Sequence, residues 1–166
     1  GRMIESVGLA RQRRPDLPHL LLISGVGGQV DRFKERAQKA GVLDHVRFLP
    51  YLDQQDLIAT YAGAEMCIYP SIVEGWGIPI TEALALGTPI ITSNTSAMPE
   101  AGGKHARYFD PHDIDSMATA IIDGIESYVP EWPRLRDDAI ATARERTWTK
   151  TAHSVLATYR EAAARG

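Results

Sequence analysis

Short apolar runs alternate with amphipathic patterns along most of this chain. The apolar runs predict strands at 19–24, 45–49, 65–70, 90–92 and 106–109. Between them, apolar residues recur every three or four positions, which predicts helices over 2–14, 30–40, 53–63 and from about 80. Strands that alternate with helices form parallel sheets through right-handed crossovers. The pattern therefore predicts an α/β fold, a Rossmann-like doubly wound parallel sheet with helices on both faces.

Some of these segments carry more specific expectations. The run from His19 to Ser24 is apolar almost throughout, which indicates a strand buried on both faces. Asp53 stands at an N-cap position, where its side chain can accept a hydrogen bond from the first helical turn. The segment Met98-Pro99-Glu100 is interpreted as a short turn before the last strand.

The carboxy-terminal part predicts extra helices. An apolar stripe from Ile114 to Ile125 indicates one helix, and Pro130 and Pro133 are expected to open another over about 134–146. Thr147 can cap a final helix that carries Trp148, Val155, Leu156 and Tyr159. Both Trp132 and Trp148 are interpreted as packing residues at helix starts.

The stretch 69–84 joins a strand to a helix through a glycine-rich turn, Glu74-Gly75-Trp76-Gly77. Pro79 follows, and its fixed φ suits a first helical turn. Such a junction presents backbone N–H groups and the positive end of a helix dipole, which together bind anions, phosphate in particular. Glu74 precedes the helix and Glu82 lies within it. Ligands of open parallel sheets bind beyond the carboxyl ends of the strands, and the turn lies at that edge.

Length and composition narrow the class of protein. The 166 residues suit a single domain, and a net charge of −3 argues against a nucleic-acid binder. Cys67, the one cysteine, lies among apolar residues and is interpreted as a small core side chain in a reducing compartment. No apolar run approaches the roughly 20 residues that span a bilayer, and no signal peptide is recognisable. We expect a cytoplasmic protein, with peripheral association at a membrane left open.

The decapeptide E-G-W-G-I-P-I-T-E-A, residues 74–83, carries a family resemblance. It resembles the Glu-x7-Glu motif of retaining glycosyltransferases with the GT-B fold, the family 4 type (group 1), usually worded E-G-F-G-L-P-x-x-E-A. Trp76 replaces Phe and Ile78 replaces Leu, and both changes keep the apolar character. Further segments match the family's wording in order and spacing, at 20–25, 45–50, 57–64, 67–71, 83–94, 99–101, 110–111 and 147–148.

The resemblance implies a donor-binding, carboxy-terminal lobe with roles for particular residues. Glu74 would be the catalytic carboxylate near the donor sugar and its anomeric carbon, and Glu82 would accept hydrogen bonds from the ribose. The remaining implied donor-binding positions are Gly25 and the backbone of Gly75, Trp76, Gly77 and Ile78 toward sugar and diphosphate, and Pro50 and Tyr51 toward the base. Pro50 departs from the glycine usual in the family.

The resemblance also implies what the intact enzyme does. It would be a hexosyltransferase that moves a hexose from a nucleotide-diphosphate sugar to a sugar, lipid or small-molecule acceptor, without a metal or other cofactor. The family's first strand, with an Arg and a Lys that neutralise the diphosphate, and its amino-terminal acceptor lobe have no counterpart here. Residues 1–166 are therefore expected to be one nucleotide-sugar-binding lobe, a fragment inactive alone. A non-catalytic nucleotide-binding module and a related GT-B epimerase or phosphorylase are the alternatives.

Three other groups of residues are candidate binding sites, but their patterns are less specific than that of the stretch 69–84. Gly25-x-Gly27-Gly28 follows a strand, but it lacks the third glycine of a dinucleotide-binding turn, and Asp44 precedes its strand. The five histidines show no metal-ligand spacing and are interpreted as structural or exposed, with Lys104-His105 in a solvated loop. A basic cluster, Arg11, Arg13 and Arg14, is interpreted as a solvated helix face in preference to an anion- or membrane-binding surface.

Overall fold

A computed structural model of the chain describes residues 1–17, 21–23 and 27–165. The strands are β1 (Leu21–Ile23), β2 (Val46–Phe48), β3 (Cys67–Tyr69), β4 (Ile90–Ser93) and β5 (Ala106–Phe109). The α-helices are α1 (Arg2–Arg13), α2 (Val30–Lys39), α3 (Gln54–Gly63), α4 (Ile78–Ala85), α5 (Met98–Gly102), α6 (Ile114–Asp123), α7 (Val129–Arg144) and α8 (Trp148–Arg165). Three 3-10 turns, η1 (Gly27–Gln29), η2 (Leu43–His45) and η3 (Gly103–His105), and a π-helical segment, η4 (Gly124–Tyr128), complete the described elements.

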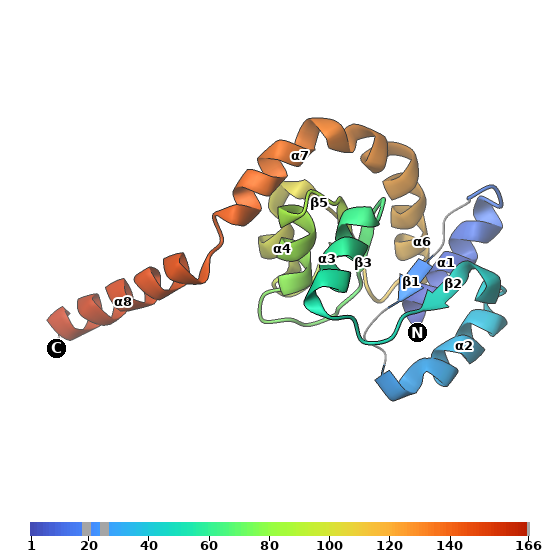
Figure 1. Cartoon of the computed structure of the whole chain (residues 1–166), viewed down its shortest axis with the longest axis horizontal. Coiled ribbons are helices and arrows are strands. Elements are labelled where there is room, and N and C mark those ends of the chain that lie inside the picture. Colours follow the sequence, from blue (N-terminus) through green and yellow to red (C-terminus); the bar gives the residue numbers. More distant parts are fainter. Residues whose placement is uncertain (18–20, 24–26, 166) are drawn as a thin grey trace.

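The strands are arranged in two parallel sheets with helices packed around them (Figure 1). In one sheet β1 pairs with β2, and in the other the strand order is β3-β4-β5. The α/β class with parallel strands is confirmed. The structure differs from the predicted single sheet because, within the described residues, no strand pairs with both β1 and β3.

Burial differs between the two sheets. All four residues of β4 are buried, as expected for a strand covered on both faces. The same expectation for 19–24 is wrong at Leu22, which is 46% exposed. Successive side chains of a strand point to opposite faces, so Leu21 and Ile23 pack against the α1 and α2 side while Leu22 faces the other way.

The hydrophobic core has two parts that α1 connects. The larger part lies around β3, β4 and β5 and includes Ala10 of α1. The smaller part is built around Ala37 and Val46 and includes Ile4 of α1. Val7, on the same helix, packs against both parts. The twelve-residue helix α1 is therefore shared by the two halves of the molecule.

The carboxy-terminal region is more continuous than predicted. Residues 98–102 form the short helix α5 where a turn was expected. The π-helical segment η4 leads from α6 directly into α7, which begins at Val129 and not near 134. The backbone hydrogen bond from the Val129 N–H to the Gly124 carbonyl continues the helix through this junction. Pro130 lies in the first turn of α7 and Pro133 lies inside it, so the prediction that these prolines open a separate helix near 134 is wrong.

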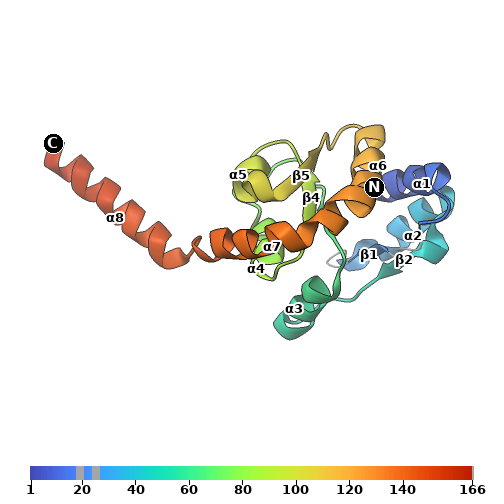
Figure 2. The same cartoon turned by 90° about the horizontal axis from the view of Figure 1, so that it is seen from above.

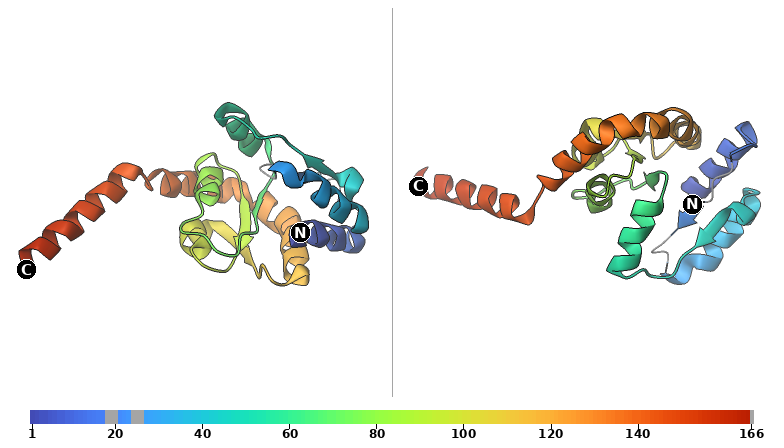
Figure 3. Two further views of the ribbon diagram at one scale, coloured as in Figure 1. Left: turned by 90° about the horizontal axis from the view of Figure 1, so that it is seen from below. Right: turned by 45° about the horizontal axis from the view of Figure 1, so that its top comes forward.

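The helix α8 extends away from the rest of the chain (Figures 2 and 3). Thr147 caps it as predicted, since its Oγ1 accepts a hydrogen bond from the Lys150 N–H at 3.2 Å. The packing role predicted for Trp148 is wrong, because α8 leaves it 82% exposed. The same prediction for Trp132 is confirmed: it is buried and its Nε1 donates to the Gly87 carbonyl at 2.8 Å.

Asp53 is the predicted N-cap of α3, and its side chain accepts a hydrogen bond from the Asp56 N–H at 2.9 Å. Of the helices in the described ranges, none combines the length and apolar character needed to cross a bilayer.

Candidate functional site

The glycine-rich turn connects the end of β3 at Tyr69 to the start of α4 at Ile78. Gly77 is the N-cap of α4 and has a φ of 94°, a left-handed conformation that side chains disfavour. A Cβ at Gly77 would also lie 3.0 Å from Cδ1 of Ile80. Pro79 occupies the first turn of α4, as predicted. Local sequence therefore determines where the strand ends and the helix begins.

Backbone donors are available at this turn. Within the part of the chain that the structure describes, the N–H groups of residues 75–78 have no hydrogen-bond acceptor. They lie at the amino-terminal end of α4, where the helix dipole is positive. This is the arrangement that favours an anionic group such as a phosphate.

Glu74 is held at the start of this turn by two hydroxyl groups. Its Oε1 accepts hydrogen bonds from the Tyr69 hydroxyl and from Ser71 Oγ, both at 2.7 Å. These two bonds favour the ionised form and lower the pKa of Glu74 below its ordinary value of 4.5. Burial, with the bond to Glu74, raises the pKa of Tyr69 to about 12, so the phenol keeps its proton at neutral pH. Glu74 is therefore a fixed carboxylate in ionised form.

The loop after β4 also contacts Glu74, which the sequence did not predict. Ser96 Oγ accepts from the Glu74 N–H at 3.2 Å and donates to the Glu74 carbonyl at 2.9 Å. The one signal available in the sequence is the polar run 92–96 at the carboxyl end of a predicted strand, on the same sheet edge as the turn.

The side chain of Trp76 anchors the turn to the body of the protein. Its Nε1 donates to Thr81 Oγ1 at 3.1 Å, and the guanidinium of Arg146 lies 5.4 Å from the centre of its ring. The indole is half-buried and packs against the larger core. Trp76 therefore presents its backbone, and not its ring, as the free part of the turn.

Glu82 lies four residues after the start of α4, a rise of about 6 Å along the helix. It is half-buried and lines a cavity of about 230 Å³ between α3 and α4. Its Oε2 accepts a hydrogen bond from the Tyr61 hydroxyl of α3 at 3.4 Å. Burial and the nearby Glu82 carboxylate raise the pKa of Tyr61. The structure thus directs Glu82 toward α3, and its part in ligand binding remains a prediction.

The residues expected to meet the base lie in the loop after β2, a strand of the other sheet. Pro50 and Tyr51 follow β2, and Tyr51 is 93% exposed. No hydrogen bond between described residues joins this loop to the turn at 74–77. Gly25, the remaining predicted position, lies outside the described residues. The structure therefore places Glu74 and 75–78 together, with Glu82 on the helix α4 that follows. The role of Pro50 and Tyr51 toward the base stays a prediction.

The basic cluster on α1 is engaged within the chain. Arg13 pairs with Asp115 of α6, and Arg14 pairs with Asp16 and with Glu126 of η4. Arg11 donates to the carbonyl of Leu17. The charges of Arg13 and Arg14 are thus balanced by acidic neighbours, which supports the structural interpretation of this cluster over a binding surface.

The loop predicted to be solvated at Lys104-His105 is solvated only in part. Lys104 is exposed and pairs with Asp138 at 2.7 Å, but His105 is 3% exposed. The prediction is wrong for His105 because α7 packs over it, bringing Thr142 Oγ1 within 3.4 Å of its Nε2. Among the described residues, no three His, Cys, Asp or Glu side chains are grouped so that they could hold a metal ion.

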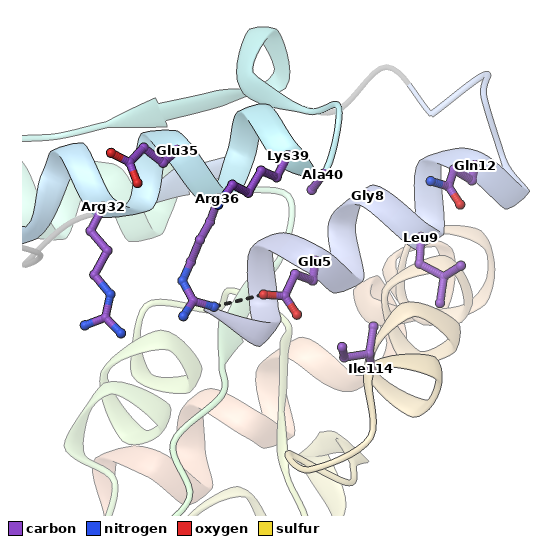
Figure 4. A pocket seen from close by; sticks show the side chains of 10 residues that line it. All are labelled: Glu5, Gly8, Leu9, Gln12, Arg32, Glu35, Arg36, Lys39, Ala40 and Ile114. Carbon is purple, nitrogen blue, oxygen red and sulfur yellow. Dashed lines mark hydrogen bonds and ion pairs between the residues drawn. The ribbon is translucent and has the colours of Figure 1, made fainter.

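A larger cavity lies away from this site, between α1 and α2 (Figure 4). It measures about 620 Å³, and side chains of both charges line it. Figure 4 shows Arg36 reaching across it to Glu5, with which it forms an ion pair at 2.9 Å. None of the residues lining it belongs to the predicted site, so its size does not identify it as the functional centre.

The family model for group 1 glycosyl transferases matches residues 2–146. The chain belongs to the group 1 glycosyltransferases. A curated relative, O-antigen chain mannosyltransferase B of Escherichia coli, is 30% identical over 145 residues, which is 84% of this chain and 37% of that protein. This group 1 glycosyltransferase chain thus spans less than half the length of that relative.

Solved structures share the fold of this group 1 chain. Sucrose-phosphate synthase of Thermosynechococcus elongatus superposes with a TM-score of 0.78 at 25% identity, over 99% of this chain and 43% of the synthase. HepE of Anabaena, solved in complex with UDP and glucose, superposes with a TM-score of 0.73 at 21% identity, over 98% of this chain and 45% of that protein. The group 1 fold places the turn at 74–77 at the carboxyl end of β3.

Proposed function

We propose that this chain is the donor-binding lobe of a retaining glycosyltransferase of the family 4 type, which moves a hexose from a nucleotide-diphosphate sugar to an acceptor. One observation carries the proposal. An ionised carboxylate, Glu74, is fixed beside N–H groups that have no acceptor among the described residues, at the amino-terminal end of α4. A nucleotide-diphosphate sugar has a group for each: its diphosphate can bind the N–H groups, and its sugar can contact the carboxylate.

The diphosphate would bind at the turn. The N–H groups of 75–78 and the dipole of α4 favour its negative charge without a cation at that point. Trp76 supports the turn through Thr81 and Arg146, so the donors are held in place before a ligand arrives. Such preorganisation lowers the cost of binding.

Glu74 would act on the sugar. Transfer of a glycosyl group develops positive charge at the anomeric carbon, which a nearby carboxylate stabilises electrostatically. Oε1 of Glu74 is occupied by Tyr69 and Ser71, whereas Oε2 has no hydrogen-bond partner among the described residues. We assign Oε2 to the donor sugar.

Glu82 would bind the ribose, since an ionised carboxylate accepts charge-assisted hydrogen bonds from a diol. In this structure its Oε2 already accepts the 3.4 Å bond from Tyr61. A ribose that binds here therefore exchanges a long bond from a phenol for shorter bonds from its own hydroxyls. Pro50 and Tyr51 would face the base.

The relatives support the proposal of a sugar-nucleotide donor. The Escherichia coli relative is named a mannosyltransferase, and the Anabaena protein of the same fold was solved with UDP and glucose. We infer that the acceptor, a sugar, a lipid or a small molecule, is bound by a part of the intact protein outside the matched region.

Calorimetry on this chain tests the proposal. We expect weak heats of binding for at least one of UDP, GDP and ADP at millimolar concentration, and for the corresponding nucleotide sugar. The same chain is expected to show no sugar transfer alone, whereas the intact enzyme transfers sugar and loses about 100-fold or more in kcat with Glu74→Gln. No heat with any nucleotide, or transfer by the chain alone, would contradict the proposal.

A further inference from the structure

Glu74 lies on a loop whose apolar side chains are not packed into the core. The loop runs from the end of β3 to the glycine-rich turn, and its two aliphatic side chains face solvent: Ile72 is 40% exposed and Val73 is 75% exposed. Burial of these side chains contributes little to the position of the loop. Its position depends instead on hydrogen bonds.

Those hydrogen bonds come from the last residue of β4 and from the loop that follows it. Ser93 Oγ donates to the carbonyl of Ser71, and Thr95 Oγ1 donates to the carbonyl of Ile72 at 2.9 Å. Ser96 Oγ donates to the carbonyl of Glu74, also at 2.9 Å. We call these three side chains, Ser93, Thr95 and Ser96, the hydroxyl clamp. They bind three carbonyls within four residues, so the end of β4 and the loop after it position the loop that carries Glu74.

Ser96 differs from the other members of the clamp in two ways. It bonds both the N–H and the carbonyl of Glu74, at 3.2 and 2.9 Å. Its φ is 53°, and of the residues that the structure describes it is the one non-glycine residue with a positive φ. A side chain in this region is sterically unfavourable, and such strain persists where the surrounding structure over-determines it. The pair of bonds to Glu74 provides that restraint.

Glu74 is therefore held from two sides. Ser96 fixes its backbone, and the hydroxyls of Tyr69 and Ser71 hold its carboxylate. We propose that Ser96 is a positioning residue for Glu74, which aims the carboxylate at the donor sugar by fixing the backbone that carries it. The catalytic consequence rests on the proposed function, but the effect of Ser96 on the Glu74 carboxylate does not.

Carbon-13 NMR of the Glu74 carboxyl group in this chain tests the effect directly. The signal is assigned with Glu74→Gln and titrated between pH 3 and 7. Ser96→Gly removes the CH2OH side chain and tolerates the left-handed backbone. In this variant we expect the pKa of Glu74 to rise toward its ordinary value of 4.5, because the bonds from Tyr69 and Ser71 lose their alignment. The matched control is Ser116→Ala, which removes a hydroxyl that accepts the Asp110 N–H in a loop after β5.

A pKa of Glu74 that is the same in Ser96→Gly and in the unmodified chain would overturn the proposal, and so would an equal rise in the Ser116→Ala control. Should the glycine variant fail to fold, Ser96→Cys answers the same question. Its thiol is a weaker donor and acceptor of similar shape, and the proposal requires a smaller upward shift of the Glu74 pKa.

In the intact enzyme, Ser96→Gly is expected to lower kcat by about 10- to 100-fold, the scale on which small misplacements of a reacting group act. The KM for the nucleotide sugar should stay within about twofold, since the N–H groups of the turn are untouched. In the Glu74→Gln background the same change should have no further effect, because the two residues act as one unit. Additive losses would refute the positioning role. Absence of any nucleotide binding would instead refute the proposed function and leave the NMR result standing.

Discussion

At the scale of single residues, the two glutamates of the motif have different surroundings. Glu74 accepts two short bonds from Tyr69 and Ser71, whereas Glu82 lies in the cavity between α3 and α4 and accepts one long bond from Tyr61. No hydrogen bond between described groups connects the two carboxylates. The pair is therefore suited to hold different parts of one ligand and not to share a proton as an acid and a base.

Glu82→Ala is expected to weaken binding of a nucleoside diphosphate by about 1–3 kcal/mol, because a charge-assisted hydrogen bond to the ribose is lost. Calorimetry with the preferred nucleotide measures the change. Glu35→Ala, at an exposed glutamate of α2, is the control and should leave affinity unchanged. Equal affinities for the unmodified chain and both variants would show that Glu82 does not take part in nucleotide binding.

Local signals in the sequence predicted the residues that shape the turn, but not those that hold Glu74. Gly77 and Pro79 act through their own backbone preferences, which are visible without a structure. Ser96 acts from the loop after the next strand, 22 residues away, and its contact with Glu74 depends on how two loops meet. Nothing in its own neighbourhood specifies that partner.

At the scale of elements, the end of α7 is fastened to α5 and to the turn by one side chain. Arg146 donates to the carbonyls of Glu100, at 3.1 Å, and Ala101, and it lies over the ring of Trp76. The carbonyls at the end of a short helix have no intrahelical donor, so a guanidinium is a suitable partner. Arg146 links three elements that are far apart in the sequence.

Arg146→Ala is expected to lower the free energy of unfolding by about 1–3 kcal/mol, since it leaves carbonyls of α5 without their donor and removes the contact with Trp76. Urea denaturation followed by circular dichroism measures the loss. Arg144→Ala, at the exposed last residue of α7, should change the free energy of unfolding little. Equal effects of the two substitutions would argue against the linking role of Arg146.

A second contact between elements depends on pH. His105 precedes β5 and is covered by α7, and its Nδ1 has no hydrogen-bond partner among the described residues. Burial lowers its pKa below the ordinary value of 6.5, with Lys104 and Arg146 acting in the same direction and Asp138 opposing them. The folded protein therefore favours the neutral imidazole. This contribution to stability is present above pH 6.5 and is lost as the pH falls through the lowered pKa.

We therefore expect the melting temperature of the chain to fall between pH 7 and pH 5 by more than that of His105→Gln, which cannot titrate. His112→Gln, at an exposed histidine, serves as the control and should follow the unmodified chain. Scanning calorimetry at several pH values makes the comparison. If the melting temperatures of His105→Gln and the unmodified chain fell equally with pH, the pH dependence would not come from His105.

Elements were predicted best where the pattern is local and strong. The caps of α3 and α8 and the limits of β5 followed from single residues and apolar runs. The joining of α6 to α7 did not, because Pro130 normally indicates a helix start and the π-helical segment η4 before it has no sequence signal of its own. Burial of Trp132 and exposure of Trp148 likewise depend on what each helix packs against, since both tryptophans begin similar patterns.

At the scale of the whole molecule, α8 contributes little to the folded body. None of its described residues is buried, and its apolar residues lie in one stripe at Trp148, Val155, Leu156 and Tyr159. Most of the stability of the chain must therefore come from the two core clusters and the helices packed on them.

A variant that ends at Thr147 is expected to keep the free energy of unfolding within about 0.5 kcal/mol of the full chain, since no buried contact is removed. A variant that ends at Arg144 removes Arg146 as well and should lose stability to about the same extent as Arg146→Ala. Urea denaturation distinguishes the two. A large loss on removal of α8 alone would show that the helix packs on the body in solution.

The helix α1 connects the two sheets and so affects the length of ligand that can bind across them. The loop with Tyr51 belongs to one sheet and the turn with Glu74 belongs to the other, and Val7 of α1 packs against the cores of both. A molecule whose base reaches the first and whose sugar reaches the second would bridge the seam between the sheets. The position of the twelve-residue helix α1 would then set the distance between the two loops. A slight tilt of α1 would change that distance, and so favour longer or shorter donors, without altering any group that contacts them.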